Sequence, residues 1–416
     1  MKELKDMTKE ILKALGISSI EKMKDELLEL VLSNDFKIKY DKYMEVVETL
    51  ETDWILNIYS NMLAERENLK QDYTPQSMSQ LVAELAFLDG KNITTCYDAC
   101  CGSGSLTLAI HKMKPSVYFY LEELDENVIP FLLFNLSIRN CNAEVINGDI
   151  IKSERKILYK VKKGDKYSSI ERCDIPSDYV IPKVDLAISN PPFNITYEEP
   201  DAKKYLDWGG YIQKGKTDYL FILKCINQTK EDGRVLIIES ESILYRTNKN
   251  DYIARKYIVD NIWLRAVIIN PENMFENTKI KTIVFFVDKT KADSSVCFVD
   301  ASDEHTTYQR FRKGAKNMST YNFAKTYNKY DEDNILNIIN RINYKQNNEE
   351  EGYITVDNDF LIKKDYDLSF RKKEEEKVIL DPWTLIYNHM EQRRKENEEF
   401  DKKIKILEET LKHIAP

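Results

Sequence analysis

Four consecutive residues, Asn190, Pro191, Pro192 and Phe193, end the apolar run "VDLAISNPPF" and have the side chains most suited to chemistry. Two adjacent prolines stop a sheet ladder and restrict the backbone, so they hold the Asn amide and the Phe ring in fixed positions. A fixed amide beside an aromatic face is suited to gripping a flat polar group in front of the strand. A buried strand followed by a stiff turn has the same local sequence, so the neighbouring motifs must decide.

A glycine-rich turn, "DACCGSGS", lies between a predicted strand and the predicted helix "SLTLAIHKM". Glycines at such a turn let a ligand approach the backbone at the carboxyl edge of a parallel sheet. A tight turn without a ligand is an equally good interpretation of this segment alone.

Acidic residues end the next two predicted strands. An acid at the end of the second strand, Glu122 or Glu123, can bond the ribose hydroxyls of a nucleotide-like cofactor, and strand alternation lets only one of the two point into the site. Asp149, at the end of the third, can accept a hydrogen bond from an adenine amino group. The glycine turn, the acid, Asp149 and the Asn-Pro-Pro-Phe segment end four successive strands, and we therefore expect them to line one edge of one sheet.

The elements that must position these residues lie between residues 93 and about 290. Short apolar strands alternate there with helices, which predicts an α/β fold with a largely parallel sheet and helices on both faces. The last two strands, "AVIIN" and "TIVFFVD", are close enough in sequence to form an antiparallel edge pair. Residues 153–182, which are charged and weakly periodic, predict an inserted loop, and residues 194–216 predict a second long loop.

Helical patterns flank this region. Residues 1–66 predict several amphipathic helices, and residues 74–88 predict another, with Thr74 as its N-cap and Pro75 at its first position. Residues 381–414 predict one long C-terminal helix with a broken apolar stripe.

The polar region after residue 300 contains a small basic patch, "QRFRKGAKNMS". These patterns predict four parts: an N-terminal helical domain (1–70), an α/β domain (71–300), an extension with the basic patch (301–378) and a C-terminal helix (379–416).

Composition narrows the possible functions. The chain has 416 residues, a formal net charge of -9, seven scattered cysteines without a C-x-x-C pair and four isolated histidines. This favours reduced thiols and no metal site. Since a free-standing nucleic-acid binder is usually basic, any DNA contact must be local or supplied by a partner. No apolar run approaches a membrane span, so we expect no membrane association and a cytoplasmic location.

Together the motifs resemble the S-adenosylmethionine-dependent amino-methyltransferases of DNA, above all the N6-adenine methylase (M) subunits of type I restriction-modification systems. The resemblance rests on "DYTPQS", "DACCGSGSL", "SNPPF" and "GKTDYLFILKCI" with "EDGRVLIIES", and it covers about residues 70–414. Two positions depart from the family pattern: Asp72 replaces an aromatic residue, and Glu239-Ser240 replaces a proline after the strand.

The resemblance implies a Rossmann-like class I methyltransferase sheet and S-adenosyl-L-methionine as cofactor. It also implies that residues 71–300 are the catalytic domain and that the C-terminal helix (379–416) serves subunit assembly. Counting back from Asn135 in "LLFNLSIRN" selects Glu123 rather than Glu122 as the family's acid. The implied cofactor-binding residues are Tyr73, Thr74, Pro75, Asp98, Cys100, Gly102, Gly104, Ser105, Glu123, Asp149 and Asn190. The implied catalytic residues are Asn190, Pro191, Pro192 and Phe193, and Phe193, Phe275 and Lys216 are expected to bind the substrate.

The implied reaction is methyl transfer to the N6 amine of an adenine flipped out of DNA. The lone pair of such an amine is delocalised into the ring, so the site must hold acceptors near it, and the Asn190 side-chain oxygen and Pro191 carbonyl can serve. The implied partners are DNA, a specificity (S) subunit with two M per S, and a restriction (R) subunit in complexes that carry one, in a bacterium or archaeon.

Two alternatives remain at this point. One is a stand-alone methylase of another planar amine (N4-cytosine, RNA adenine or protein glutamine), because these enzymes share Asn-Pro-Pro-aromatic. The other is a non-catalytic assembly protein that keeps the fold, for which the two departures leave room.

Overall fold

The structure, a computed structural model, describes residues 4–62, 74–197, 215–275, 280–313, 322–345 and 347–370, together with Arg394. The chain divides into two compact units, Met1–Lys372 and Lys373–Pro416, and the fold described below belongs to the first. The predicted C-terminal helix, apart from Arg394, lies outside the described residues, and the four predicted domain boundaries stay predictions.

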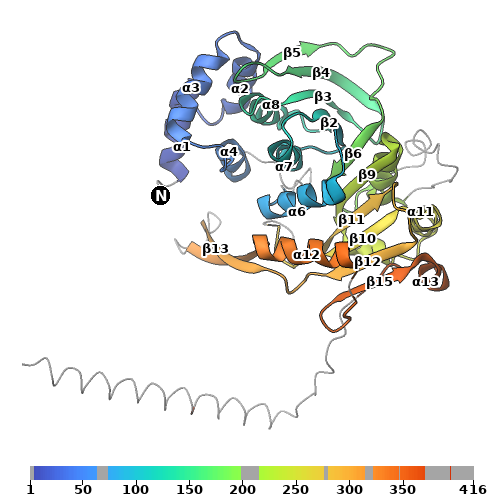
Figure 1. Cartoon of the computed structure of the whole chain (residues 1–416). Helices are drawn as coiled ribbons and strands as arrows, with labels where there is room; N and C mark the ends of the chain where they lie inside the picture. The colour runs from blue at the N-terminus through green and yellow to red at the C-terminus, as the bar shows by residue number, and fades with distance from the viewer. Residues whose placement is uncertain are drawn as a thin grey trace, which may run out of the picture. The chain divides into compact units, whose positions relative to one another are not determined.

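In the described part of the chain, one sheet of eleven strands carries the fold, in the order β15-β12-β10-β11-β9-β6-β1-β2-β3-β4-β5 (Figure 1). Strands β3, β2, β1, β6 and β9 run parallel, and helices connect most of them, which confirms the predicted α/β class. The strands are β1 (Thr95–Asp98), β2 (Tyr118–Glu123), β3 (Asn142–Asp149), β4 (Glu154–Lys162), β5 (Ser169–Cys173), β6 (Val184–Ser189), β9 (Thr229–Ser240), β10 (Leu264–Ile269), β11 (Thr282–Asp288), β12 (Ser295–Asp300) and β15 (Tyr353–Asp357).

Strands β10 and β11 form the predicted antiparallel pair, but the pair does not lie at the sheet edge. Strand β11 lies between β9 and β10, and β12 and β15 extend the sheet beyond β10. The reason is that all seven residues of β11 are buried, so this strand requires neighbours on both sides.

The prediction of a loop at residues 153–182 is wrong, because this segment contains β4 and β5. They pair antiparallel with each other and add two strands at the other end of the sheet. Their sequence is charged because these two strands lie at one end of the sheet and expose one face to solvent. Lys162 and Glu171 form an ion pair across the strands at 2.7 Å, while Leu158 and Val161 are buried.

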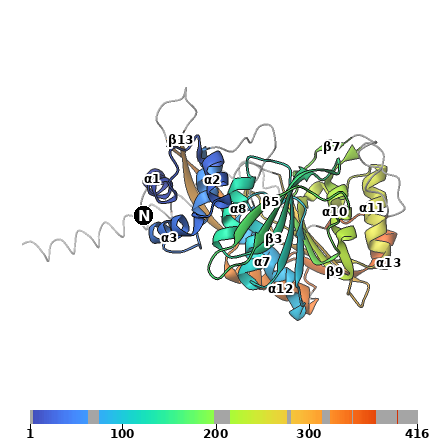
Figure 2. The same cartoon turned by 90° about the horizontal axis from the view of Figure 1, so that it is seen from above.

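Helices cover both faces of the sheet, as predicted (Figure 1, Figure 2). One core contains residues of α6, α7, α8 and α12, and the other contains residues of α10, α11 and α13. Strand β6 shows how the sheet separates them, since Leu186 and Ile188 belong to the first core and Val184 and Ala187 to the second. The bounds are α6 (Gln76–Ala86), α7 (Ser105–Met113), α8 (Ile129–Ile138), α10 (Asp218–Gln228), α11 (Lys249–Asp260), α12 (Glu332–Tyr344) and α13 (Asn358–Lys363).

The N-terminal helices pack on α8, every residue of which is buried. Helices α1 (Leu4–Leu15), α2 (Met23–Leu32), α3 (Phe36–Val47) and α4 (Trp54–Met62) confirm the helical prediction for the described part of residues 1–66. The rings of Tyr40 and Tyr43 in α3 meet Phe134 of α8 edge to face, with centroids 5.0 and 5.1 Å apart. These helices therefore share a core with the sheet.

The helix predicted at residues 74–88 exists as α6, with Met78, Leu81, Val82 and Leu85 buried as its inner face. Its first residue is Gln76 and its N-cap is Pro75, so the predictions of Thr74 as the N-cap and of Pro75 as the first helical residue are both wrong. The physical reason is that the Thr74 hydroxyl accepts a hydrogen bond from a residue far along the chain, described below, instead of bonding its own helix.

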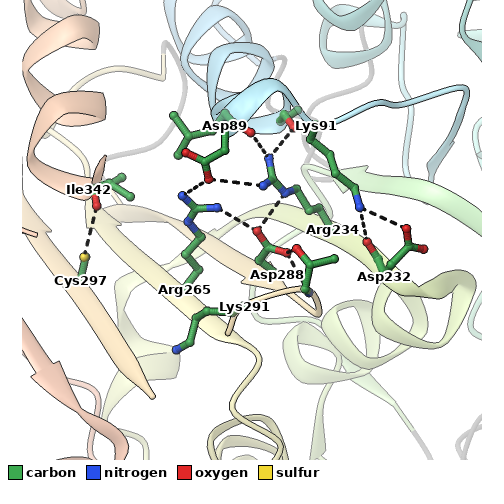
Figure 3. A network of polar contacts seen from close by, with 12 residues as sticks. Asp89, Lys91, Asp232, Arg234, Arg265, Asp288, Lys291, Cys297 and Ile342 are labelled. Carbon is green, nitrogen blue, oxygen red and sulfur yellow. Dashed lines mark hydrogen bonds and ion pairs between the residues drawn. The ribbon is translucent and has the colours of Figure 1, made fainter. Parts of the chain in front are cut away.

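A buried ion-pair network fastens the end of α6 to the sheet at the edge where the parallel strands begin (Figure 3). Asp288, which is 1% exposed, forms ion pairs with Arg234 Nε and Arg265 Nη1, both at 2.9 Å. Arg265 also bonds Asp89 at 2.6 Å, and Arg234 donates to the carbonyls that end α6. The cations of this network are matched by carboxylates or backbone carbonyls, so it stabilises the packing of α6 on β9, β10 and β11.

Within the described residues, two small antiparallel sheets are separate from the large one. One joins β7 (Thr196–Tyr197) to β8 (Gly215–Lys216), and the other joins β13 (Thr306–Lys313) to β14 (Asn322–Lys329). Among the described helices, none combines the length and the apolar character that a membrane crossing requires.

Candidate functional site

A cavity of about 710 Å³ opens at the carboxyl edge of the parallel strands. It lies where β1, β2, β3 and β6 end, the four strand ends at which the sequence motifs lie. The predicted site residues that line it are Thr74, Asp98, Cys100, Gly102, Ser105, Glu123, Asp149, Asn190, Pro191, Pro192, Phe193 and Lys216. Pro75, Gly104 and Phe275 are not among the lining residues, and Tyr73 lies outside the described residues.

The glycine-rich turn needs both of its glycines, for different reasons. Gly102 has a φ of 52° and lines the cavity, and a Cβ added there would meet open space. Gly104 has a φ of 96° and caps α7, and a Cβ there would lie 3.0 Å from Leu132 Cδ1. Gly102 therefore exposes the backbone to a ligand, whereas Gly104 permits the turn that places it there.

The two acids at the end of β2 point to different surroundings. Glu123 lines the cavity and accepts hydrogen bonds from the backbone N–H groups of Gly102 (2.7 Å) and Asp125 (2.8 Å). Glu122 accepts from the Tyr97 hydroxyl and pairs with Arg155 at 3.6 Å. Burial raises the pKa of Glu123 to about 7. Of the two, the geometry favours Glu123 as the acid that faces a ligand.

Two aspartates also line the cavity, at the ends of β1 and β3. Asp98 accepts from Thr107 Oγ1 (3.2 Å) and from a backbone N–H of the glycine-rich turn, and burial raises its pKa to about 7. Asp149 accepts from the N–H groups of Ile151 and Lys152, and its second oxygen lies 3.4 Å from Lys152 Nζ. Both carboxylates are therefore oriented by the chain around them.

Asn135 supports the turn from below. It is 1% exposed, and its Nδ2 donates to the Ser103 carbonyl at 3.1 Å and to Asp53 Oδ2 at 2.8 Å. Asp53 begins α4, so the N-terminal helices connect through Asn135 to the glycine-rich turn. The sequence marked Asn135 only as a family position, and the contact with Asp53 spans 82 residues.

Asn190 follows β6, whose six residues are all buried. Its side-chain Nδ2 donates to Thr74 Oγ1 at 3.0 Å, and both residues line the cavity. The bond fixes the orientation of the amide plane, because it uses one of the two branches of the side chain. Thr74 and Asn190 are thus brought together although 116 residues separate them.

Phe193 lines the cavity and is 8% exposed. The ring of Phe275, which is 3% exposed, meets it edge to face with centroids 6.3 Å apart. Phe275 therefore lies behind Phe193 rather than forming a second wall of the cavity, and its substrate-binding role stays a prediction.

Asn194, directly after the Asn-Pro-Pro-Phe segment, has a φ of 60°, which is unusual for a residue other than glycine. Its N–H donates to Asp218 Oδ1 (3.2 Å), its side-chain oxygen accepts from Arg246 (3.3 Å) and its carbonyl accepts from Lys216 Nζ (2.7 Å). Arg246 also pairs with Asp218 (3.3 Å) and Asp251 (2.7 Å). These contacts, which we call the Asn194 clamp, hold the end of the Asn-Pro-Pro-Phe segment. The two aspartates and the arginine of the clamp are not among the residues predicted from the sequence.

Glu239, one of the two departures from the family pattern, is fully buried beside the clamp. Burial, reinforced by the negative charge of Asp218, raises the pKa of Glu239 well above its usual range. The ion pairs of Arg246 are made with Asp218 and Asp251, so the clamp contacts are present alongside this departure.

The loop predicted at residues 194–216 is closed at its base by the pairing of β7 with β8. Lys216 lines the cavity, although its ammonium group is bonded to the Asn194 carbonyl. Residues 198–214, including Lys203, Lys204 and Lys214, lie outside the described residues.

The cavity lining is acidic overall. Among the described lining residues, four acids (Asp98, Glu123, Asp125 and Asp149) outnumber two lysines (Lys152 and Lys216), with the pKa of both Asp98 and Glu123 raised by burial to about 7. Such a lining favours a ligand with a positive charge, and the exposed turn backbone and the anchored Glu123 suit a nucleoside with ribose hydroxyls.

Comparison with known proteins identifies the family. The profile of the N-6 DNA Methylase family matches residues 31–381. The chain belongs to this family. The type I restriction enzyme MpnII methylase subunit of Mycoplasma pneumoniae is 28% identical over 336 residues, which cover 76% of this chain and 55% of that protein. The MjaVII methylase subunit of Methanocaldococcus jannaschii is 25% identical, covering 98% of this chain and 67% of that protein.

This chain thus spans between half and two thirds of the length of these relatives. Among solved structures, the type I restriction-modification methyltransferase subunit from Streptococcus thermophilus superimposes with a TM-score of 0.60 and 21% identity, covering 88% of this chain and 78% of that one. This similarity confirms the methyltransferase fold that the sequence of this chain predicts.

Proposed function

We propose that this chain is the modification subunit of a type I restriction-modification complex, and that it transfers a methyl group from S-adenosyl-L-methionine to the N6 amine of a flipped adenine in DNA. The observation that carries the proposal is the joint presence of Asn190, held by Thr74, and of Glu123 and Gly102 in one cavity. Membership of the N-6 DNA Methylase family supports it.

The residues present fit the cofactor. Gly102 leaves its backbone open to the cavity, and two backbone N–H groups orient Glu123 so that its remaining lone pairs can accept from ribose hydroxyls. The acidic lining suits a cationic ligand. When bound, S-adenosyl-L-methionine supplies the methyl group, which it carries on a positively charged sulfur.

The chain's own residues then act on the amine of the base. The Asn190 side-chain oxygen and the Pro191 carbonyl accept hydrogen bonds from the amine, which frees its lone pair from the ring as the methyl group arrives. The two prolines and the Asn194 clamp keep these acceptors in place. The base stacks on Phe193, which contributes roughly 1–3 kcal/mol by analogy with single-strand binding. No strong base is required, because the proton leaves after transfer.

Assembly with other subunits completes the proposal. The net charge of -9 argues for a partner that supplies most of the DNA contact, and we assign this role to a specificity subunit, with two M per S and an R subunit where the system has one. The predicted C-terminal helix is the segment that we expect to bind the specificity subunit.

The direct test incubates the protein with methyl-labelled cofactor and DNA, with and without the specificity protein encoded beside it, and analyses the nucleosides. We expect labelled N6-methyladenine only when the specificity protein is present. Label in N4-methylcytosine, or in RNA or protein but not DNA, would replace the proposal by a stand-alone amino-methyltransferase, and no label with any acceptor would indicate an assembly protein.

A further inference from the structure

We infer that the β13–β14 ribbon is a contact surface for the phosphate backbone of duplex DNA beside the catalytic cavity. The inference rests on the proposed function, because it states where the substrate duplex lies on the chain. Figure 1 shows β13 projecting beside α12 and apart from the eleven-stranded sheet.

The ribbon is basic in an acidic protein. Its two strands carry the cations Arg310, Arg312, Lys313, Lys325 and Lys329, and no Asp or Glu occurs from Thr306 to Lys329. The chain as a whole has a formal net charge of -9. A local block of positive charge of this kind is the electrostatic footprint of a polyanion-binding surface.

The strand register works against the stability of the ribbon alone. Arg310 lies directly opposite Lys325 in the antiparallel ladder. Like charges placed opposite each other are destabilising, and an isolated two-stranded ribbon is at best marginally stable. A bound anion relieves this repulsion, whereas a purely structural ribbon gains nothing from it.

Aromatic packing nevertheless anchors the base of the ribbon. The rings of Tyr308 and Tyr327 pack with centroids 5.6 Å apart, and Tyr327 is fully buried. Lys325 Nζ lies 4.8 Å from the centre of the Tyr327 ring, and Lys329 is exposed. The base therefore presents positive charge from an ordered platform, which lowers the entropy cost of binding.

The base also joins the ribbon to the edge of the sheet that holds the cavity. Asn328 N–H donates to the Asn273 carbonyl at 3.1 Å, and Tyr330, just after the ribbon, bonds Asn270 at the end of β10 at 2.9 Å. Two residues after Asn273, Phe275 packs on Phe193 of the catalytic segment. Two contacts thus separate the ribbon from the ring on which the flipped base is proposed to stack.

The positive side chains of the ribbon suit backbone phosphates, and the sugar-phosphate backbone receives roughly half to two-thirds of all protein–DNA hydrogen bonds. Contacts to phosphate carry no sequence information, and each neutralised phosphate contributes roughly 0.9 to the slope of log K against log salt. The ribbon is therefore expected to anchor the duplex in register with the cavity and to leave sequence recognition to the partner.

The experiment measures binding of a fluorescent duplex of about 30 base pairs to the full chain by anisotropy, between about 50 and 200 mM salt, where such binding is salt-sensitive. In the ribbon variant Arg310→Gln/Arg312→Gln/Lys313→Gln, the magnitude of the slope of log K against log salt should fall by about 2 to 3. Binding at low salt should also weaken. Arg310→Lys/Arg312→Lys should keep the wild-type slope, because the charge is retained.

A matched control removes three lysines at the opposite edge of the sheet, Lys160→Gln/Lys162→Gln/Lys163→Gln, and should bind DNA as the wild type does. The inference is overturned if the wild type binds no duplex, or if the ribbon variant keeps the wild-type slope and affinity. It is also overturned if the control variant loses as much DNA affinity as the ribbon variant. Loss of double-stranded RNA binding alone in the ribbon variant would overturn it as well.

Cofactor titration separates this inference from the proposed function. The ribbon variant should bind S-adenosyl-L-methionine with wild-type affinity, which also shows that it is folded. A wild-type protein that binds DNA through the ribbon but methylates nothing with its specificity subunit would refute the proposed function and leave the ribbon inference standing.

Discussion

Ionisation of Glu123 should oppose folding while it serves cofactor binding. Burial raises the pKa of Glu123 from 4.5 to about 7. A group whose folded pKa lies above its unfolded value stabilises the fold fully at pH values below 4.5, and this stabilisation is lost as the pH rises through 7. The two pKa values correspond to about 2 to 3 kcal/mol of stability lost between about pH 5 and pH 8.

Glu123→Gln removes this titration. The variant also loses one oxygen acceptor for the N–H group of Gly102 or Asp125, which lowers its free energy of unfolding by an amount that does not depend on pH. The informative quantity is therefore the change, between pH 5 and pH 8, in the difference in free energy of unfolding between variant and wild type. The difference in free energy of unfolding, variant minus wild type, should be about 2 to 3 kcal/mol larger at pH 8 than at pH 5, because only the wild type loses stability as Glu123 ionises. Asp98 has a pKa that burial raises to about 7, and the charge of Glu123 contributes to that shift. Removing Glu123 therefore lowers the pKa of Asp98 in the variant, which acts on the stability difference in the same direction.

Urea unfolding of both proteins at the two pH values measures the stability difference, and calorimetry at pH 8 measures binding of S-adenosyl-L-methionine. Binding should weaken by roughly 1–3 kcal/mol, the size of a lost charge-assisted hydrogen bond. Glu122→Gln is the matched control for cofactor affinity, because that acid faces Tyr97 and Arg155. A pH-independent stability difference, or a larger binding loss in the Glu122 variant, would refute the reasoning.

Three further predictions follow from other contacts. Asp288→Asn should lower the free energy of unfolding by about 3–5 kcal/mol in urea, because it leaves the buried Arg234 and the partly buried Arg265 without their shared carboxylate, and a loss under about 1 kcal/mol would contradict this. Arg246→Met should slow methyl transfer without changing cofactor affinity, and equal rates would show that the Asn194 clamp is dispensable. Deletion of residues 381–416 should leave cofactor binding intact and abolish co-purification with the specificity subunit; a truncated protein that still assembles and methylates DNA would show that this segment serves another purpose.

The sequence predicted those features that depend on short-range patterns. Alternation of strands and helices was enough for the α/β fold, and the order of the motifs was enough to bring Asp98, Glu123, Asp149 and Asn190 to one cavity. Strand alternation also required that only one of the paired glutamates face it, as the structure has it.

The features that were missed depend on long-range contacts or on solvated strands. β4 and β5 carry charges on an exposed edge and resemble a loop when taken as a sequence. Thr74 has the residue type of an N-cap, but its hydroxyl meets Asn190, 116 positions away. The Asn194 clamp brings in Arg246 from 52 positions away, and no local pattern marks that arginine.

The central claim is that Asn190 acts on an adenine amine beside a cofactor bound in the same cavity. The most direct measurement compares wild type with Asn190→Ala in one assay series: calorimetric binding of S-adenosyl-L-methionine, then chromatography of nucleosides from DNA incubated with the assembled complex. We predict near-equal cofactor affinities, with N6-methyladenine formed by the wild type alone, because the lost acceptor acts in the transition state. Substantial N6-methyladenine from Asn190→Ala would contradict the claim.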